Sequence, residues 1–104
     1  MTIEVTDSNF KKEVTESKTP VVLKFEADWC GPCQAMKPLY EDLSKELKDV
    51  KFCSIDVDNK PKTAQEFGVR SIPMFVVVNK GNPVGAFVGG MSKTELKSKI
   101  KGFL

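Results

Sequence analysis

The sequence predicts an α/β protein: a three-layer α/β/α sandwich in which a central mixed five-stranded sheet is flanked by four helices. Three observations support this. The 104 residues fit one domain, expected to span residues 1–104, and an apolar content of 40% is sufficient for one core. Strand-like and helix-like segments alternate in the order β-α-β-α-β-α-β-β-α, which favours a largely parallel sheet. The last two strands are separated only by a turn, so they predict an antiparallel hairpin.

The first elements are a short strand, a helix and a central strand. Ile3 and Val5 predict the strand, and Asp7 is placed to cap the helix that follows. Residues 21–27 are rich in β-branched and aromatic side chains, which is typical of a strand in the middle of a sheet. The sheet is therefore predicted to be built around residues 21–27.

The second helix is expected to begin immediately after this central strand. From residue 33 onward, apolar and aromatic side chains recur at helical spacing, at Met36, Leu39, Tyr40, Leu43 and Leu47. A third strand is predicted over residues 50–57. A short helix follows, with Pro61 near its start and Gly68 just past its end.

A hairpin and a helix complete the chain. Strands predicted over residues 74–78 and 84–88 flank a turn-forming stretch at residues 79–83. Ser92 and Glu95 then match a capping box, which marks the start of the last helix.

Composition narrows the chemistry that the chain can perform. Sixteen basic and fourteen acidic residues give a net charge of +2, which provides no reason to expect nucleic acid or a membrane as a partner. Histidine is absent, which excludes imidazole-based nucleophiles and imidazole metal ligands. No secretory signal or membrane-spanning stretch is readable, and three cysteines are too few for a disulfide framework. A monomer in the reducing cytoplasm is expected.

Two cysteines separated by Gly31 and Pro32 carry the strongest functional signal. Only a thiolate attacks a disulfide, and Cys30 is placed at the amino end of a predicted helix, where free N–H groups and the helix dipole favour the thiolate. Two intervening residues allow Cys33 to reach Cys30 and resolve a mixed disulfide. The alternative, half of a zinc site, lacks ligands because only Cys53 remains, so no metal site is expected.

The chain resembles the thioredoxin family over essentially its whole length. The Trp-Cys-Gly-Pro-Cys motif at residues 29–33 is identical to the active-site motif of that family, and Ile72-Pro73 and Gly89 reinforce the match. The resemblance implies a thioredoxin fold and a protein-disulfide reductase, a thiol–disulfide oxidoreductase that takes part in electron transport and cell redox homeostasis. It also implies that Cys30 is the nucleophile, that Cys33 is the resolving thiol, and that the two form a redox-active disulfide.

The resemblance further implies a substrate-binding surface around the dithiol, with Pro73 in the cis conformation. The residues of this expected surface are Trp29, Gly31, Pro32, Ile72, Pro73, Val88 and Gly89. From position alone, other interpretations stay open: Trp29 as a packing residue, Pro73 as the start of a strand, and Gly89 with Gly90 as part of a turn.

The family pattern is broken at two positions of the central strand. Lys24 stands where thioredoxins typically carry a buried aspartate, and Glu26 replaces a common tryptophan. Residues two apart in a strand share a face, so we hypothesise that Glu26 takes the proton-transfer role while Lys24 supplies its counter-charge. The alternative is that both side chains reach solvent or form a purely structural ion pair. Gln34 similarly replaces a basic residue that many relatives carry after the motif.

The resemblance also suggests the partners. Electrons are expected from a thioredoxin reductase, either NADPH- and flavin-dependent or ferredoxin-linked, with disulfide-containing proteins as substrates and no cofactor bound to this chain. One rival is a disulfide-forming oxidant or isomerase, although such oxidants usually carry a histidine between the cysteines. Another is a non-catalytic docking subunit of a larger complex. Cys53 is expected to be a small buried hydrophobe without a catalytic role.

Overall fold

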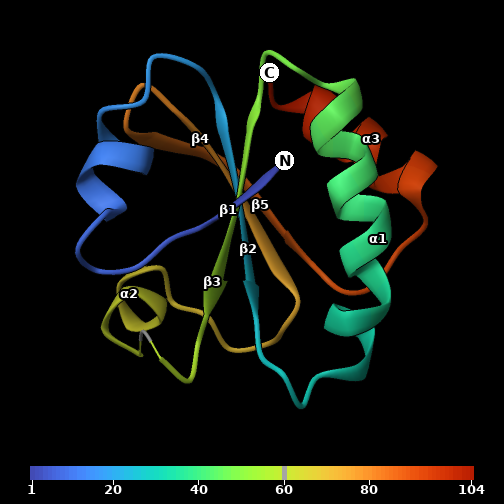
Figure 1. Cartoon of the computed structure of the whole chain (residues 1–104), viewed down its shortest axis with the longest axis horizontal. Coiled ribbons are helices and arrows are strands. Elements are labelled where there is room, and N and C mark those ends of the chain that lie inside the picture. Colours follow the sequence, from blue (N-terminus) through green and yellow to red (C-terminus); the bar gives the residue numbers. More distant parts are fainter. Residues whose placement is uncertain (60) are drawn as a thin grey trace.

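In the computed structural model, which describes residues 1–59 and 61–104, a mixed five-stranded sheet lies between two helical layers (Figure 1). This confirms the predicted fold class and the predicted order of elements. The strands run in the spatial order β1-β3-β2-β4-β5, so β2 is the central strand. β3 pairs in parallel with both β1 and β2, whereas β4 pairs antiparallel with both β2 and β5. The strand bounds are β1 (Thr2–Glu4), β2 (Val21–Glu26), β3 (Lys51–Asp56), β4 (Met74–Asn79) and β5 (Asn82–Val88).

Each face of the sheet is covered by its own helices. α1 (Gly31–Glu46) and α3 (Lys93–Gly102) lie on one side, and α2 (Pro61–Glu66) and a π-helical turn, η1 (Lys11–Thr15), lie on the other (Figure 1). Two separate apolar clusters of buried side chains result, one in each interface between sheet and helices. Among the described residues, no helix is long and apolar enough to cross a membrane.

The start of the first helical segment differs from its prediction. η1 has Phe10 at its N-cap position and no side-chain cap, so Asp7 does not cap it. Asp7 instead accepts a hydrogen bond from the Thr63 hydroxyl, with 2.8 Å between the oxygens. Thr6 and Asn9 close the preceding turn themselves, because the Asn9 side chain accepts from the Thr6 N–H at 2.6 Å and the Asn9 N–H donates to the Thr6 hydroxyl at 3.3 Å. The Asn9 N–H, which an Asp7 cap could have bound, is thus bound to Thr6.

The hairpin turn is tighter than the five residues predicted. β4 extends to Asn79 and β5 begins at Asn82, so the turn consists of Lys80 and Gly81, with φ of 52° and 80°. Positive φ at both positions is the mark of a type I′ turn, which matches the twist of the two strands. Pro83 therefore lies inside β5, beside an irregularity in the pairing with β4. A proline is tolerated there because β5 is an edge strand.

The last helix begins as predicted. Ser92 occupies the N-cap of α3, and its side-chain oxygen accepts a hydrogen bond from the Glu95 N–H at 3.2 Å. Leu96 and Ile100 then bury the apolar face of α3 against the sheet, in the same cluster as side chains of α1. This packing fixes α3 beside α1, whose first turn carries the dithiol.

Candidate active site

The dithiol lies where the central strand passes into α1. β2 ends at Glu26, and α1 begins at Gly31 with Cys30 at its N-cap. Cys30 and Cys33 form a disulfide, and their Cα atoms are 5.2 Å apart. The sequence thus brings both sulfurs together at the carboxyl end of the sheet, which is where α/β folds usually place their sites.

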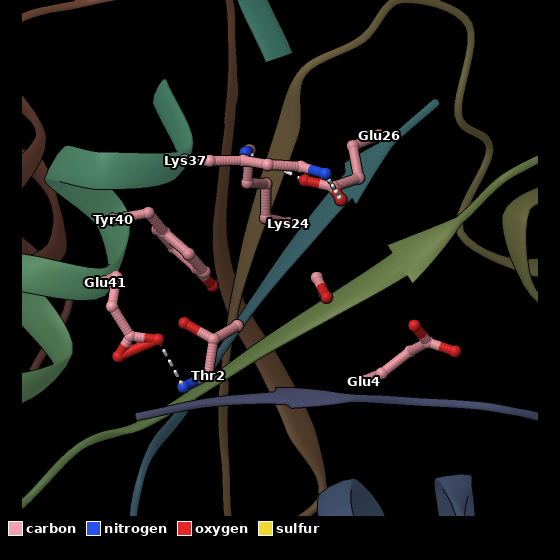
Figure 2. A pocket seen from close by; sticks show the side chains of 8 residues that line it. Thr2, Glu4, Lys24, Glu26, Lys37, Tyr40 and Glu41 are labelled. Carbon is pink, nitrogen blue, oxygen red and sulfur yellow. Dashed lines mark hydrogen bonds and ion pairs between the residues drawn. The ribbon is translucent and has the colours of Figure 1, made fainter. Parts of the chain in front are cut away.

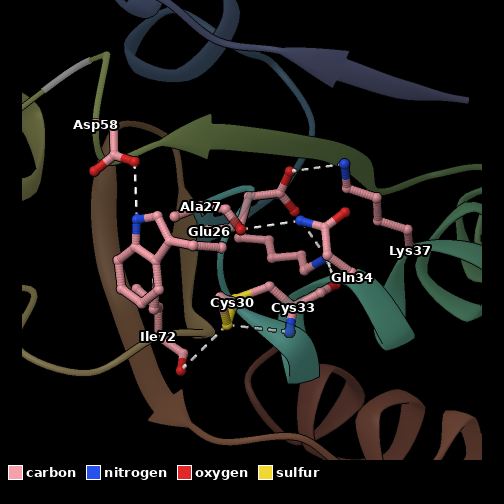
Figure 3. Close-up of a disulfide and its surroundings, with 10 residues drawn as sticks. Glu26, Ala27, Cys30, Cys33, Gln34, Lys37, Asp58 and Ile72 are labelled. Atoms are coloured by element: carbon pink, nitrogen blue, oxygen red, sulfur yellow. Dashed lines mark hydrogen bonds and ion pairs between the residues drawn. A yellow bond between two sulfur atoms is a disulfide. The ribbon is translucent and has the colours of Figure 1, made fainter.

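The Cys30 sulfur is held by the first turn of the helix. The Cys33 N–H points at this sulfur, with 3.2 Å between nitrogen and sulfur, and the Ile72 carbonyl oxygen lies 3.9 Å away on the other side (Figure 3). Cys30 is 5% exposed and Cys33 is fully buried. A backbone donor and the amino end of a helix both favour negative charge, so Cys30 is placed to carry the thiolate.

Gln34 holds the loop before the dithiol in place. Its side-chain amide donates to the Ala27 carbonyl at 2.9 Å, and the same carbonyl accepts from the Cys30 N–H at 3.1 Å (Figure 3). From the sequence, Gln34 is notable only because it stands where many relatives carry a basic residue. Its hydrogen bond joins the first turn of α1 to the end of β2, a contact that no local pattern reveals.

Trp29 forms an exposed surface beside the sulfurs. Its side chain is 70% exposed, and its indole N–H donates to the Asp58 carboxylate at 2.9 Å. This exposure argues against Trp29 being a core packing residue. Asp58, which was not among the predicted site residues, fixes the orientation of the indole from the loop after β3 (Figure 3).

The remaining predicted surface residues come from the first turn of α1, from β5 and from the loops beside β4 and β5. The Ile72–Pro73 peptide bond is cis, as the resemblance implied, and the Gly89 N–H donates to the Pro73 carbonyl at 2.9 Å. Val88 is 56% exposed, and Gly31 and Pro32 are also exposed. A Cβ atom at Gly89 would meet nothing within 4 Å, so the backbone φ of +105°, not lack of space, is what requires glycine there.

Lys24 and Glu26 form an ion pair beneath the dithiol. The Lys24 ammonium lies 2.8 Å from a Glu26 carboxylate oxygen, and it also donates to the Cys33 carbonyl at 2.9 Å. The Lys24 side chain is 1% exposed and that of Glu26 is 14% exposed, so the two charges do not simply extend into solvent. Burial lowers the pKa of Lys24, and the hydrogen bond and charge of Glu26 act in the opposite direction.

A cavity of about 350 Å³ connects this ion pair to the surface. Figure 2 shows Lys37 and Glu26 meeting above Lys24 at one end of it, and the Lys37 ammonium lies 3.8 Å from Glu26. The Tyr40 ring contributes another wall, with its centroid 5.5 Å from the Lys24 nitrogen. The cavity is lined by Thr2, Glu4, Lys24, Glu26, Lys37, Tyr40, Glu41 and Ser54.

The third cysteine is placed apart from this chemistry. Cys53 is fully buried in β3, and burial raises the pKa of its thiol to about 12. A thiol of that pKa is almost entirely protonated at neutral pH, which disfavours a role as a nucleophile. Within residues 1–59 and 61–104, no group of three potential ligand side chains is arranged to hold a metal ion.

Comparisons with known proteins agree with this geometry. The sequence profile of the family described as Thioredoxin matches residues 1–102. A thioredoxin of Rickettsia prowazekii is 43% identical, with 92% of each chain covered. A thioredoxin of Synechocystis is 36% identical, with 99% of this chain and 97% of the relative covered. A protein of Nostoc named thioredoxin 1 is 35% identical over 97% of this chain and 95% of its own length.

Proposed function

Because this chain belongs to the thioredoxin family, we propose that Cys30 and Cys33 are the residues with which it reduces protein disulfides. The chain is a thiol–disulfide oxidoreductase, a protein-disulfide reductase. The observation that carries the assignment to these two residues is the disulfide at the amino end of α1, with Cys30 at the N-cap. Such a position stabilises a thiolate, the only form of sulfur that attacks a disulfide.

In the proposed reaction, the Cys30 thiolate attacks one sulfur of a substrate disulfide. A mixed disulfide forms, and the other substrate sulfur leaves as a thiolate. Cys33 then loses its proton and attacks the Cys30 sulfur, so the mixed disulfide breaks and the second substrate sulfur is released. The substrate gains two electrons, and the Cys30–Cys33 disulfide that remains has lost two.

The proton of Cys33 must leave before this second attack, and we assign Glu26 a role in accepting it. Glu26 is linked to Cys33 through Lys24, which contacts the Glu26 carboxylate and the Cys33 carbonyl. The cavity beside Glu26 gives the proton a route to water. Lys24 provides the counter-charge that keeps a carboxylate stable in this largely buried position.

The exposed groups around the dithiol form the surface on which an extended substrate would lie. Trp29 and Val88 provide apolar contact, and the Ile72 carbonyl faces Cys30. Gly31 and Pro32, which are exposed, and Gly89, which is half-buried, complete this surface. Pro73 is itself buried, and its cis peptide bond sets the position of Ile72 in this surface. A backbone carbonyl beside the nucleophile can align a peptide without reading its sequence, which suits a general reductase.

The cycle requires a source of two electrons. We assign this role to a thioredoxin reductase, NADPH- and flavin-dependent or ferredoxin-linked, which reopens the Cys30–Cys33 disulfide while this chain itself binds no cofactor. A monomer with one domain over residues 1–104, working in the cytoplasm in electron transport and redox homeostasis, fits this cycle.

Reduction of insulin disulfides tests the assignment. The wild type should reduce insulin when a chemical reductant regenerates it, whereas Cys30→Ser should have no activity above background. Cys33→Ser should accumulate a stable mixed disulfide through Cys30, which mass spectrometry detects. If the chain were instead a docking subunit in which the dithiol has no function, neither substitution would change the outcome of these two assays.

The Glu26 role requires a separate measurement. Glu26→Gln should slow the release step at neutral pH, and the rate should recover as the pH rises because hydroxide then removes the proton. A pH profile identical to that of the wild type would reject proton transfer by Glu26 while leaving the roles of the two cysteines intact.

A further inference from the structure

A buried cation, the Lys24 ammonium, lies close to the dithiol. Its nitrogen lies 2.9 Å from the carbonyl oxygen of Cys33, the same residue that carries one of the two sulfurs. The other sulfur, that of Cys30, is held by the Cys33 N–H at 3.2 Å. Lys24 therefore contacts the residue that carries one sulfur and that donates a hydrogen bond to the other. The Lys24 side chain is almost completely shielded from solvent.

The charges around Lys24 do not cancel. Glu26 pairs with Lys24 through one carboxylate oxygen and faces Lys37 at 3.8 Å through the other, so two cations share one anion. The remaining carboxylates that line the cavity are Glu4, which is exposed, and Glu41, which is bound to the N-terminal ammonium at 3.1 Å. The Tyr40 hydroxyl points instead at the carbonyls of the sheet, and burial raises its pKa well above its ordinary value, so it stays neutral.

A buried cation beside a sulfur affects the two redox states differently. The disulfide is neutral, whereas the reduced form carries the thiolate that the proposed reaction requires. A positive charge that water does not screen stabilises the thiolate and leaves the disulfide almost unaffected. Glu26 opposes this effect, because its negative charge lies 2.8 Å from the Lys24 ammonium and offsets the field of that cation.

We propose that Lys24 sets the redox equilibrium of the dithiol, by stabilising the thiolate-bearing reduced state with a positive charge that Glu26 partly offsets. The half-reaction is the cleavage of the Cys30–Cys33 bond by two electrons from a thiol reductant, with one sulfur taking up a proton and the other remaining a thiolate. This proposal rests on the proposed function, since it concerns the same dithiol. It differs by assigning to Lys24 a direct effect on the equilibrium in addition to its support of Glu26.

The test is the equilibrium between the protein and a glutathione redox buffer at pH 7.5. Lys24→Met removes the charge and keeps a long apolar side chain, so the fraction reduced should fall, with the equilibrium constant for reduction about three- to tenfold lower. Glu26→Gln keeps the size of the side chain and removes the opposing charge, so the same constant should rise about two- to fivefold. Lys97→Met, a substitution on the exposed surface of α3, serves as the matched control and should change nothing.

The opposite signs of the two shifts separate the electrostatic role from a structural one. If Lys24 only tied down the first turn of α1, both substitutions would weaken the same contacts and shift the equilibrium in the same direction. The shifts should also shrink as the pH falls and the thiolate becomes protonated, because the charge that Lys24 stabilises is then lost. Shifts of equal sign, or shifts that persist at pH 5, would overturn the proposal.

Two further readouts keep the outcome interpretable. Should Lys24→Met fail to fold, as thermal unfolding of the oxidised protein would reveal, Glu26→Gln and its pH dependence still decide the question. If the proposed function itself were wrong, Cys30→Ser would retain insulin reduction. If only this inference were wrong, Cys30→Ser would be inactive while Glu26→Gln left the glutathione equilibrium unchanged.

Discussion

The two faces of β2 differ in chemistry although alternate residues of one six-residue strand form them. On the side of η1 and α2, Val21, Leu23 and Phe25 are fully buried in an entirely apolar cluster. On the side of α1 and α3, the apolar Val22 is followed by Lys24 and Glu26, which form a largely buried ion pair beside a polar cavity. One strand thus combines an ordinary core with a buried ion pair.

This difference indicates what each face contributes. Apolar burial adds stability in proportion to the area removed from water, so the first face anchors the sheet. A buried ion pair commonly does no better than apolar side chains of the same size, because both ions lose their hydration. The second face therefore carries a group that stability alone does not require, directly beneath the sulfurs. Four experiments test this division between the faces.

The largest effect is expected from Phe25→Ala on the apolar face. Phe25 is fully buried and contacts the Phe67 ring, with 5.5 Å between the centroids. Because the truncation leaves a cavity, the free energy of unfolding should fall by about 3–5 kcal/mol. Urea denaturation of the oxidised protein measures the change, with the exposed Val84→Ala as a control. A loss below about 1 kcal/mol would mean that this face does not anchor the sheet.

A second experiment probes the thiol on the apolar face. In a Cys30→Ser, Cys33→Ser variant, Cys53 is the remaining thiol, and its pKa of about 12 in place of 9.0 leaves about a thousandth of the thiolate at pH 8. Alkylation in the native state should be at least that much slower than in urea, and its rate should rise with pH. Rapid labelling of the folded protein at pH 8 would show that this face opens to solvent.

The third experiment makes the charged face apolar. Replacing Lys24 with Met and Glu26 with Leu together removes two partly desolvated charges without leaving either one unpaired beneath α1. The free energy of unfolding should rise by about 1–4 kcal/mol, measured by urea denaturation. The single substitutions are the controls, because each leaves one charge behind. A double variant less stable than the wild type would show that the ion pair is itself a source of stability.

The smallest effect is expected from Tyr40→Phe, which removes one buried hydroxyl on the charged face. The Tyr40 oxygen lies 3.0 Å from the Val22 carbonyl and 2.7 Å from the Cys53 carbonyl, so its single proton is shared between two strands. The free energy of unfolding should fall by about 1–2 kcal/mol. Thermal and urea unfolding measure it. An unchanged free energy of unfolding would mean that the hydrogen bonds of the Tyr40 hydroxyl do not stabilise the fold.

Much of this fold could be predicted from the sequence, because the signals involved are local. The Ser92 cap, the helix after Cys30 and the alternation of elements all depend on residues a few positions apart. The residues at which helices and strands begin and end were less predictable. The hairpin turn narrowed to Lys80 and Gly81 because strand pairing extended further than the apolar runs, and Asp7 lost its predicted cap to a contact with Thr63.

The active site divides in the same way. The two cysteines and the cis Pro73 follow from a motif and a family resemblance, and the structure brings them together. Asp58 and Gln34 were missed as contacts, because each binds a group that only the folded chain brings near. The sequence also predicted that Lys24 and Glu26 share a face, but not that Lys24 would lie between Glu26 and Cys33.

Trp29 is the only tryptophan in the chain, and it precedes Cys30 directly while Asp58 holds its ring. A disulfide accepts an electron from an excited indole, whereas a dithiol does so far less readily. The ultraviolet emission of the protein should therefore brighten when the Cys30–Cys33 bond opens. The emission of Trp29 would then allow each opening of the disulfide to be followed without an added label.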